Sequence, residues 1–239
     1  MNSLKVIEKV ASKIAPGRIP SFTEIHVIKA LETIGSEGAI GRKRLSELLG
    51  FGEGATRTLV RHLKLEGLIK TSKSGIALSR FGEKVFSELK SRISGGVEIP
   101  ESPLAVGPFN VAVLIRNVAH LIKYGLEQRD AVVKVGALGA TTLIFRRDKL
   151  TVPGVREDFL KDTQSIYETL VTKLEPREDD VIIIGSANEK RSAEFGAKAA
   201  AYELLKTKNR KSTHTRITQD HLSSFKGNWD LFNRTRQKI

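Results

Sequence analysis

Residues 39–80, AIGRKRLSELLGFGEGATRTLVRHLKLEGLIKTSKSGIALSR, hold the pattern that decides the fold of this chain of 239 residues. The leucines of residues 42–49 recur at i, i+3 and i+4, the spacing of one buried helix face. Gly50-Phe51-Gly52 interrupts this spacing, and glycine is the residue that tight turns favour. Helical spacing resumes over residues 53–66. The stretch therefore predicts two helices joined by a short turn.

The second predicted helix has two chemically different faces. Leu59 and Leu63 belong to its apolar face, since they are four residues apart. Arg57, Arg61 and Lys64 follow one another at i, i+4 and i+7 on the opposite face. A basic stripe of this kind is most often a solvated helix surface, so the stripe alone assigns no function.

Two short strands follow the second helix, over residues 68–71 and 76–79, and a basic Lys73-Ser74-Gly75 tip joins them. A helix-turn-helix followed directly by a hairpin is the plan of a winged helix. In that plan the second helix enters the DNA major groove, where Arg bonds bidentately to guanine and Lys neutralises phosphate. The turn, the basic helix and the basic hairpin together favour DNA binding over a solvated surface.

Three runs carry a resemblance to a known family: IGRKRLSELLG, VRHLKLEGLI and GIALSRFGEKVF. They resemble the winged-helix domains of bacterial and archaeal repressors, especially the N-terminal domain of the glycolytic operon repressor. The whole chain is similar to an archaeal family of winged-helix proteins with a second domain of unassigned function. The resemblance implies a winged-helix fold and a regulatory role. It supplies neither an effector nor an operator.

The net charge of +13 is confined to two regions of the chain. Residues 1–98 carry 17 Lys and Arg against 10 Asp and Glu, and residues 206–239 carry 9 against 2. Residues 99–205 are close to neutral, with 14 against 15. An anionic partner such as nucleic acid would therefore meet the two ends of the chain and not its middle.

Several functional classes lack their sequence signals. Cysteine is absent, which excludes disulfides, thiolate metal sites and a cysteine nucleophile. The histidines are scattered, and neither a metal-ligand spacing nor a nucleophile-elbow motif is found. The charged N-terminus is unlike a signal peptide, and no apolar stretch is long enough to span a membrane. We expect a cytoplasmic protein with no cofactor, no metal, no catalytic residue and no membrane partner.

Composition divides the chain into five predicted parts. An amphipathic N-terminal helix over residues 3–14 either packs back on the next domain or pairs with another subunit. Gly, Pro and Ser cluster after the winged helix and predict a linker there. The parts are residues 1–20 (helix and connector), 21–94 (winged helix), 95–108 (linker), 109–206 (α/β domain that senses an effector) and 207–239 (basic tail).

The second domain is predicted to follow the order β-α-β-β-α-β-α. That order is typical of a ferredoxin-like split βαβ unit with one helix appended. A short parallel sheet is the alternative, because residues 182–184 are all isoleucine, as in a strand buried on both faces. The predicted fold class is α+β, a winged helix followed by a small α/β sandwich domain. The strands are residues 110–115, 141–145, 150–152 and 181–184, and the helices are residues 117–128, 159–174 and 190–205.

Two sets of residues are candidates for binding. The predicted DNA-binding residues are Arg42, Lys43, Arg44, Arg57, Thr58, Arg61, Lys64, Lys73 and Ser74. The predicted ligand-binding residues are Gly185, Ser186, Ala187 and Asn188. The second set lies where a strand meets an alanine-rich helix, and N–H groups at a helix start hold anions. A plain turn capped by Asn188 is the simpler interpretation. The small-residue loop of residues 136–142 is a weaker candidate of the same kind.

We therefore predict a DNA-binding transcriptional regulator, not an enzyme. It would bind double-stranded DNA as a homodimer, and its second domain would sense a small metabolite, such as an anionic one, or mediate dimerisation. Two alternatives are left open. One is an enzyme or small-molecule-binding protein that acts through the α/β domain. The other is an RNA-binding or ribonucleoprotein component that uses the basic tail.

Overall fold

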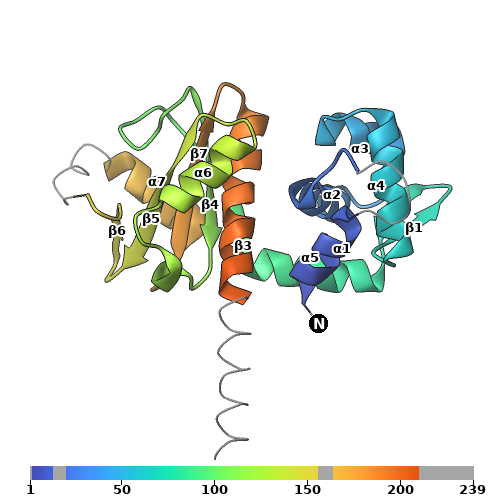
Figure 1. Cartoon of the computed structure of the whole chain (residues 1–239), viewed down its shortest axis with the longest axis horizontal. Coiled ribbons are helices and arrows are strands. Elements are labelled where there is room, and N and C mark those ends of the chain that lie inside the picture. The colour runs from blue at the N-terminus through green and yellow to red at the C-terminus, as the bar shows by residue number, and fades with distance from the viewer. Residues whose placement is uncertain (1, 13–19, 156–163, 210–239) are drawn as a thin grey trace, which may run out of the picture.

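The computed structural model describes residues 2–12, 20–155 and 164–209. A helical N-terminal domain lies beside a five-stranded sheet, and a helix of residues 190–209 stands between them (Figure 1). The fold class is α+β, as the sequence predicts. The predicted tail of residues 207–239 and the first part of the predicted helix over residues 159–174 fall largely outside the described residues.

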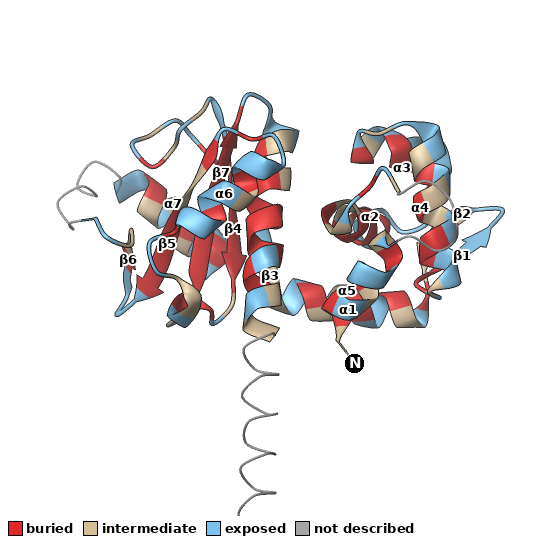
Figure 2. Ribbon diagram, in the orientation of Figure 1, coloured by how far each residue is buried: buried red, intermediate tan, exposed pale blue. Residues whose placement is uncertain are grey.

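The N-terminal domain contains the predicted helix-turn-helix and hairpin. Both helices and both strands of residues 39–80 match their predicted bounds within two residues. Figure 2 shows the hairpin projecting as an exposed element beside the second of these helices. The elements are α1 (Ser3–Ala11), α2 (Glu24–Glu37), α3 (Arg42–Leu49), α4 (Glu53–Leu65), β1 (Ile69–Ser72), β2 (Gly75–Leu78) and α5 (Arg80–Arg92).

Helix α1 packs back on its own domain, which is one of the two predicted alternatives. It buries Leu4, Ile7 and Val10 in the common core. The carbonyl oxygen of Val10 lies 2.8 Å from Nδ1 of His62, a buried residue of α4. This polar contact joins α1 to α4 because a buried imidazole must find a hydrogen-bond partner. The helix is described as far as Ala11, and the last two residues of the predicted helix lie outside the described residues.

All strand pairs of the second sheet are antiparallel, so the parallel alternative is wrong. From β4 onward the chain follows the predicted order β-α-β-β-α-β-α, but an unpredicted strand, β3, precedes it, and the strands are arranged differently from a ferredoxin-like sheet. There the last strand lies at an edge, whereas here β7 is central, in the order β3-β4-β7-β5-β6. The strands are β3 (Ile93–Ile99), β4 (Phe109–Ile115), β5 (Gly139–Arg146), β6 (Lys149–Thr151) and β7 (Val181–Ala187).

Strand β3 corrects the predicted linker. Residues 95–99 belong to an edge strand that pairs with β4, so α5 leads directly into the sheet. Glycine and proline near residues 95–103 indicate a linker by composition, but Gly95 lies at a bulge within the strand pair. Glycine suits such a bulge because it tolerates backbone conformations closed to other residues. Helix α5 ends at Arg92 and β3 begins at Ile93, so no linker separates the winged helix from the sheet.

Helix positions in the second domain are the least accurate sequence predictions. The predicted helix over residues 117–128 is wrong: a short 3₁₀ helix (Ala119–Leu121) precedes α6 (Leu126–Lys134). Gly125 interrupts the pattern with a left-handed backbone, φ 77°. Helix α7 is described over Gln164–Leu174, and the alanine-rich helix extends over residues 190–209.

The sheet buries both faces through the two-residue period of its strands. In β4, Val111, Val113 and Ile115 join one cluster with the 190–209 helix and the N-terminal core. Ala112 and Leu114 face the other cluster, which α7 covers. The same alternation occurs in β7, which explains its run of three isoleucines in an antiparallel setting. One apolar core is thus continuous from the N-terminal domain to one face of the sheet.

Gly82 in α5 provides a stability test of this packing. A Cβ atom there would lie 1.9 Å from the carbonyl oxygen of Leu68. Gly82→Ala should lower the free energy of unfolding by about 3 kcal/mol, because backbone must shift to relieve the overlap. Gly54→Ala is the matched control, since no heavy atom lies within 4 Å of its Cβ position. It should stabilise α4 by about 0.5–1 kcal/mol. Urea unfolding of both variants measures the difference, and equal effects would contradict the described packing.

Candidate nucleic-acid interface and its contact with the second domain

The turn between α3 and α4 is fixed by three local features. Gly50 adopts a left-handed conformation, φ 75°, and its N–H donates to the carbonyl of Ser46 at 2.9 Å. The Ser46 hydroxyl donates to the carbonyl of Phe51 at 2.7 Å. A residue with a Cβ resists this conformation, so the glycine is required by the turn. The turn sets the angle at which α4 leaves the domain.

Helix α4 presents its predicted basic face to solvent. Thr56, Leu59, His62 and Leu63 are buried, whereas Arg57, Arg61 and Lys64 are exposed. Within the part of the chain that the structure describes, none of these three cations makes an ion pair. Their donors are therefore available to an anionic partner.

Thr58 is less available than its neighbours on α4. It is half-buried, and its hydroxyl already donates to the carbonyl of Gly54 at 3.1 Å. The oxygen of that hydroxyl can still accept a hydrogen bond. Thr58 can therefore contact a donor on a base edge, but not an acceptor, without breaking its helix bond.

The remaining predicted DNA-binding residues belong to α3 and the hairpin. The first turn of α3 exposes Arg42, Lys43 and Arg44. Nη1 of Arg44 lies 3.7 Å from Oε2 of Glu47. Lys73 and Ser74 form the exposed hairpin turn. Main-chain bonds between Ile40 and Ile76 tie the start of α3 to the hairpin. Figure 1 shows the hairpin beside α4 at the outer side of the domain, away from the sheet.

The predicted ligand site does not have the geometry that motivated it. Gly185, Ser186 and Ala187 are buried in β7, so their N–H groups do not begin a helix. Gly185 and Ser186 pair with both neighbouring strands, and Ala187 pairs with β4. The Ser186 hydroxyl donates to Asn110 Oδ1 at 2.6 Å. Asn188 is exposed after the strand.

Helix packing, not ligand binding, accounts for the glycine of this segment. A Cβ at Gly185 would lie 2.5 Å from the carbonyl oxygen of Ala193 on the 190–209 helix. Glycine lets the helix backbone approach the strand closely. The weaker loop candidate, residues 136–142, is also largely strand, because β5 begins at residue 139. The two segments on which an enzyme hypothesis depends are thus structural parts of one sheet.

Two family models match the chain, and they divide it as the fold does. Residues 27–93 match the model of the CggR N-terminal DNA binding domain. Residues 106–204 match a domain of unknown function, DUF4443. The chain carries a winged-helix DNA-binding domain. A DUF4443 domain follows it and contains β4 to β7 with most of the 190–209 helix.

A solved structure shares this combination of elements. The chain is similar to a hypothetical protein from Pyrococcus horikoshii, with 28% sequence identity and a TM-score of 0.63. The match covers 78% of this chain and 95% of that one. No curated protein matches the chain. The archaeal source of the neighbour agrees with the resemblance to archaeal winged-helix proteins.

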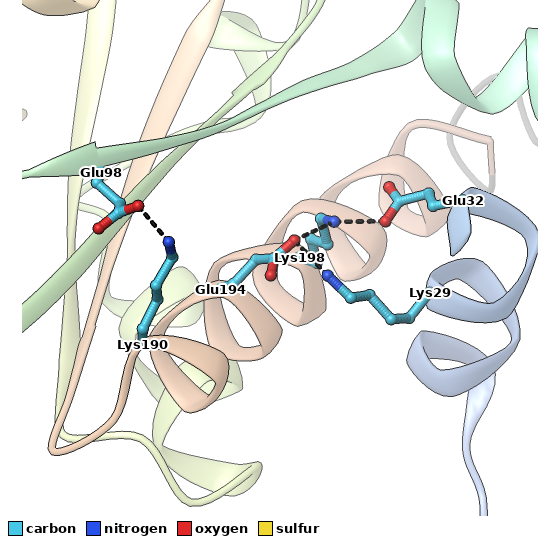
Figure 3. A network of polar contacts seen from close by, with 6 residues as sticks. All are labelled: Lys29, Glu32, Glu98, Lys190, Glu194 and Lys198. Carbon is cyan, nitrogen blue, oxygen red and sulfur yellow. Dashed lines mark hydrogen bonds and ion pairs between the residues drawn. The ribbon is translucent and has the colours of Figure 1, made fainter. Parts of the chain in front are cut away.

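The DUF4443 domain contacts the winged-helix domain through a charge network, drawn in Figure 3. Glu194 and Lys198 project from the 190–209 helix toward Lys29 and Glu32 on α2. Lys29 Nζ and Lys198 Nζ each lie 2.7 Å from Glu194 Oε1. Lys198 also donates to Glu32. Two cations and two anions from both domains thus alternate across the contact.

Burial makes this network strong. Only 7% of the Lys198 side chain is exposed. Burial by itself lowers the pKa of Lys198. Glu32 and Glu194 together raise that pKa by more than burial lowers it, so the net shift is upward. Burial raises the pKa of Glu194, whereas Lys198 and Lys29 lower it to about 2. Glu194 and Lys198 therefore both stay ionised at neutral pH, as a paired buried charge requires.

The helix-turn-helix itself touches the second domain at two further points. Arg191 Nη2 donates to the carbonyl of Glu47 at 3.4 Å, and a Cβ at Gly50 would lie 2.1 Å from Arg191 Nη1. His26 of α2 contacts Phe51 in a T-shaped arrangement and Phe195 in a tilted one, with ring centroids 5.0 and 4.7 Å away. Burial lowers the pKa of His26, so its ring is neutral near pH 7. The DUF4443 domain thus packs directly on the turn that orients α4.

Sequence reasoning missed this interface, although one signal for it exists. Glu194 and Lys198 are the charged residues in an alanine-rich stretch, and they are four apart, the spacing of a helical ion pair. Charge inside an otherwise apolar helix face indicates a buried partner. His26 is a lone histidine in the sequence, and no local pattern marks it. It is half-buried and lies in the contact between the domains.

Among residues 2–12, 20–155 and 164–209, no group of three His, Cys, Asp or Glu side chains is placed to hold a metal ion. No helix in that part of the chain is long and apolar enough to cross a membrane. Asp180, directly before β7, is buried, and its Oδ2 lies 2.6 Å from Nη1 of Arg116.

Two lysines of the 190–209 helix provide a matched test of the charge network. Lys198→Ala should lower the free energy of unfolding by about 2–4 kcal/mol, because it leaves Glu32 and Glu194 without their shared cation. Lys190→Ala removes the same charge from an exposed pair with Glu98 and should cost less than about 1 kcal/mol. Chemical unfolding of both variants gives the comparison. Equal losses would show that the network contributes nothing beyond a surface ion pair.

The depressed pKa of Glu194 predicts acid sensitivity. Its carboxylate contributes stability that is complete above the ordinary value of 4.5 and is lost as the pH falls toward about 2. Glu194→Gln should therefore have a lower free energy of unfolding than wild type at pH 7. The difference in free energy between the two proteins should shrink as the pH falls from 5 to 2. Unfolding midpoints measured across that range test the prediction. A gap independent of pH would mean that the ionised carboxylate is not the stabilising form.

Proposed function

We propose that this protein is a sequence-specific transcriptional regulator whose winged helix binds operator DNA. Arg57, Thr58, Arg61 and Lys64 on α4 would contact bases in the major groove. The observation that carries the proposal is the set of exposed cations on α4, the second helix of the helix-turn-helix, in a domain that matches a DNA-binding family model. Arg42, Lys43, Arg44, Lys73 and Ser74 would contact phosphates on either side.

Dimerisation and effector sensing are parts of the same proposal. A homodimer would bind two half-sites, which is how helix-turn-helix proteins commonly gain affinity and specificity. The DUF4443 domain would change DNA affinity in response to a small metabolite, since it packs on the turn before α4. A protein of this kind acts on chromosomal DNA and would work in the cytoplasm of an archaeal cell. Its DNA-binding domain points to a binding protein and not to an enzyme.

Genomic DNA retention is the direct experiment. The purified full chain is mixed with fragmented genomic DNA of its source, and the retained fragments are sequenced at several salt concentrations. A few sites that share an inverted repeat support a dimeric regulator. Uniform retention that falls steeply with salt means phosphate contacts without sequence recognition. That result, or a preference for structured RNA at the same salt, would contradict the proposal.

Two substitutions separate base recognition from phosphate contact. Arg61→Ala should cost about 1–3 kcal/mol of discrimination between the retained site and unrelated duplex. Lys73→Ala should weaken binding to every sequence alike. It should also reduce the slope of the logarithm of affinity against the logarithm of salt concentration by about one. Lys190→Ala, which removes one charge from the DUF4443 domain, is the control and should change neither. Fluorescence anisotropy with labelled duplexes measures all three. If the first two substitutions leave duplex binding unchanged, the assigned surface is wrong.

A further inference from the structure

A cavity of about 180 Å³ lies between the helix-turn-helix and the 190–209 helix. Its walls come from both domains: Lys29, Leu48 and Gly50 from the winged helix, and Arg191, Phe195 and Lys198 from the DUF4443 domain. The network of Figure 3 forms one side of it. The cavity therefore exists only while the two domains are docked.

The charges around this cavity do not balance. Glu194 and Glu32 offset Lys29 and Lys198, which leaves the guanidinium of Arg191 as the unbalanced cation. In the described part of the chain, the hydrogen bond that Arg191 donates is a long one, 3.4 Å from Nη2 to the carbonyl oxygen of Glu47. Guanidinium carries five donors in a planar fork, so most of its hydrogen-bonding capacity is unused.

Lys29 of α2 supplies a second set of donors to the lining of the cavity. Its ammonium has three protons, and one of them is directed to Glu194 at 2.7 Å. The others can reach a second acceptor without breaking that pair. A guanidinium and an ammonium that line one cavity can bind an oxyanion together, since phosphate and carboxylate oxygens accept from both.

The cavity suits a small ligand that has an apolar part. Leu48, Leu49 and Phe195 contribute apolar surface to its lining. A phosphate or a short carboxylic acid fits a space of about 180 Å³.

We propose that this cavity is an effector site for a small oxyanion, a phosphate or carboxylate group on a short carbon skeleton. Arg191 binds the anion bidentately, Lys29 binds it from α2, and Leu48 and Phe195 contact the carbon skeleton. This site replaces the Gly185–Asn188 segment as the place where the DUF4443 domain senses a metabolite. The regulatory consequence rests on the proposed function, but binding of the anion does not.

The position of the site allows anion binding to change the affinity for DNA. An anion held by Lys29 and Arg191 contacts both domains, so it binds the docked arrangement better than a separated one. A ligand shifts an equilibrium only through such a difference in affinity. Arg191 also contacts the chain at Glu47 and Gly50, next to the turn that orients α4. Occupation of the cavity would therefore fix the direction in which α4 is presented.

Equilibrium dialysis of the full chain tests the site without DNA. The probes are radiolabelled inorganic phosphate and, in a separate arm, malonate, with ionic strength held constant by sodium chloride. Wild type should bind one equivalent saturably, and Arg191→Ala should weaken binding at least about tenfold. Lys190→Ala removes the neighbouring cation on the same helix and should change affinity less than about twofold, because its side chain pairs with Glu98. Circular dichroism verifies that both variants are folded.

The outcomes separate the parts of the proposal. Tighter binding of phosphate identifies phosphorylated ligands, and tighter binding of malonate identifies carboxylates. Saturable binding that survives in Arg191→Ala, equal losses in both variants, or no saturable binding of either probe overturns the site. A bound probe that leaves DNA affinity unchanged at constant ionic strength overturns the regulatory consequence. Loss of DNA binding in Arg61→Ala with intact phosphate binding would show that the two surfaces are independent.

Discussion

The structure depends on a lysine buried between two glutamates at the contact of its domains. Lys198 lies on a helix that belongs to the sheet of the second domain, and Glu32 lies on α2 of the winged helix. Interfaces between domains of one chain are usually polar enough to permit relative motion. Here a cation with 7% of its side chain exposed must keep both carboxylates near it, or else it remains buried without a partner. Separation of the domains would break these pairs and is therefore costly.

This network also explains why the 190–209 helix has two different faces. The alanine residues at 193 and 197 let its backbone approach Gly185 of β7 closely. Its other side presents Arg191, Glu194 and Lys198 to the winged helix. One helix thus packs in the core of the DUF4443 domain and contacts the turn before α4. It is the element through which a change in one domain reaches the other.

The DNA-binding surface is rigid for reasons that are independent of this contact. Gly50 sets the turn, the Ser46 hydroxyl closes it, and the buried His62 fastens α4 to the carbonyl of Val10 on α1. The basic side chains of α4 project from a helix that is held on its opposite face. The second domain can therefore move the winged helix as a unit and need not reshape it.

The sequence by itself determined the winged helix and the division of charge. Its helices, turn and hairpin follow from local periodicity and from glycine, which act over neighbouring residues. For the same reason the exposed cations of α4 could be assigned before the structure was known.

Tertiary structure decided the rest. Gly185 and Ser186 look like a turn at a helix start, but β7 occupies the centre of the sheet, and pairing on both sides extends the strand through them. The network of Lys29, Glu32, Glu194 and Lys198 forms only because α2 packs against the 190–209 helix. The paired residues of the two helices are more than 150 positions apart in the sequence. No local pattern encodes which distant charges will be buried against each other, because that depends on how the two domains pack.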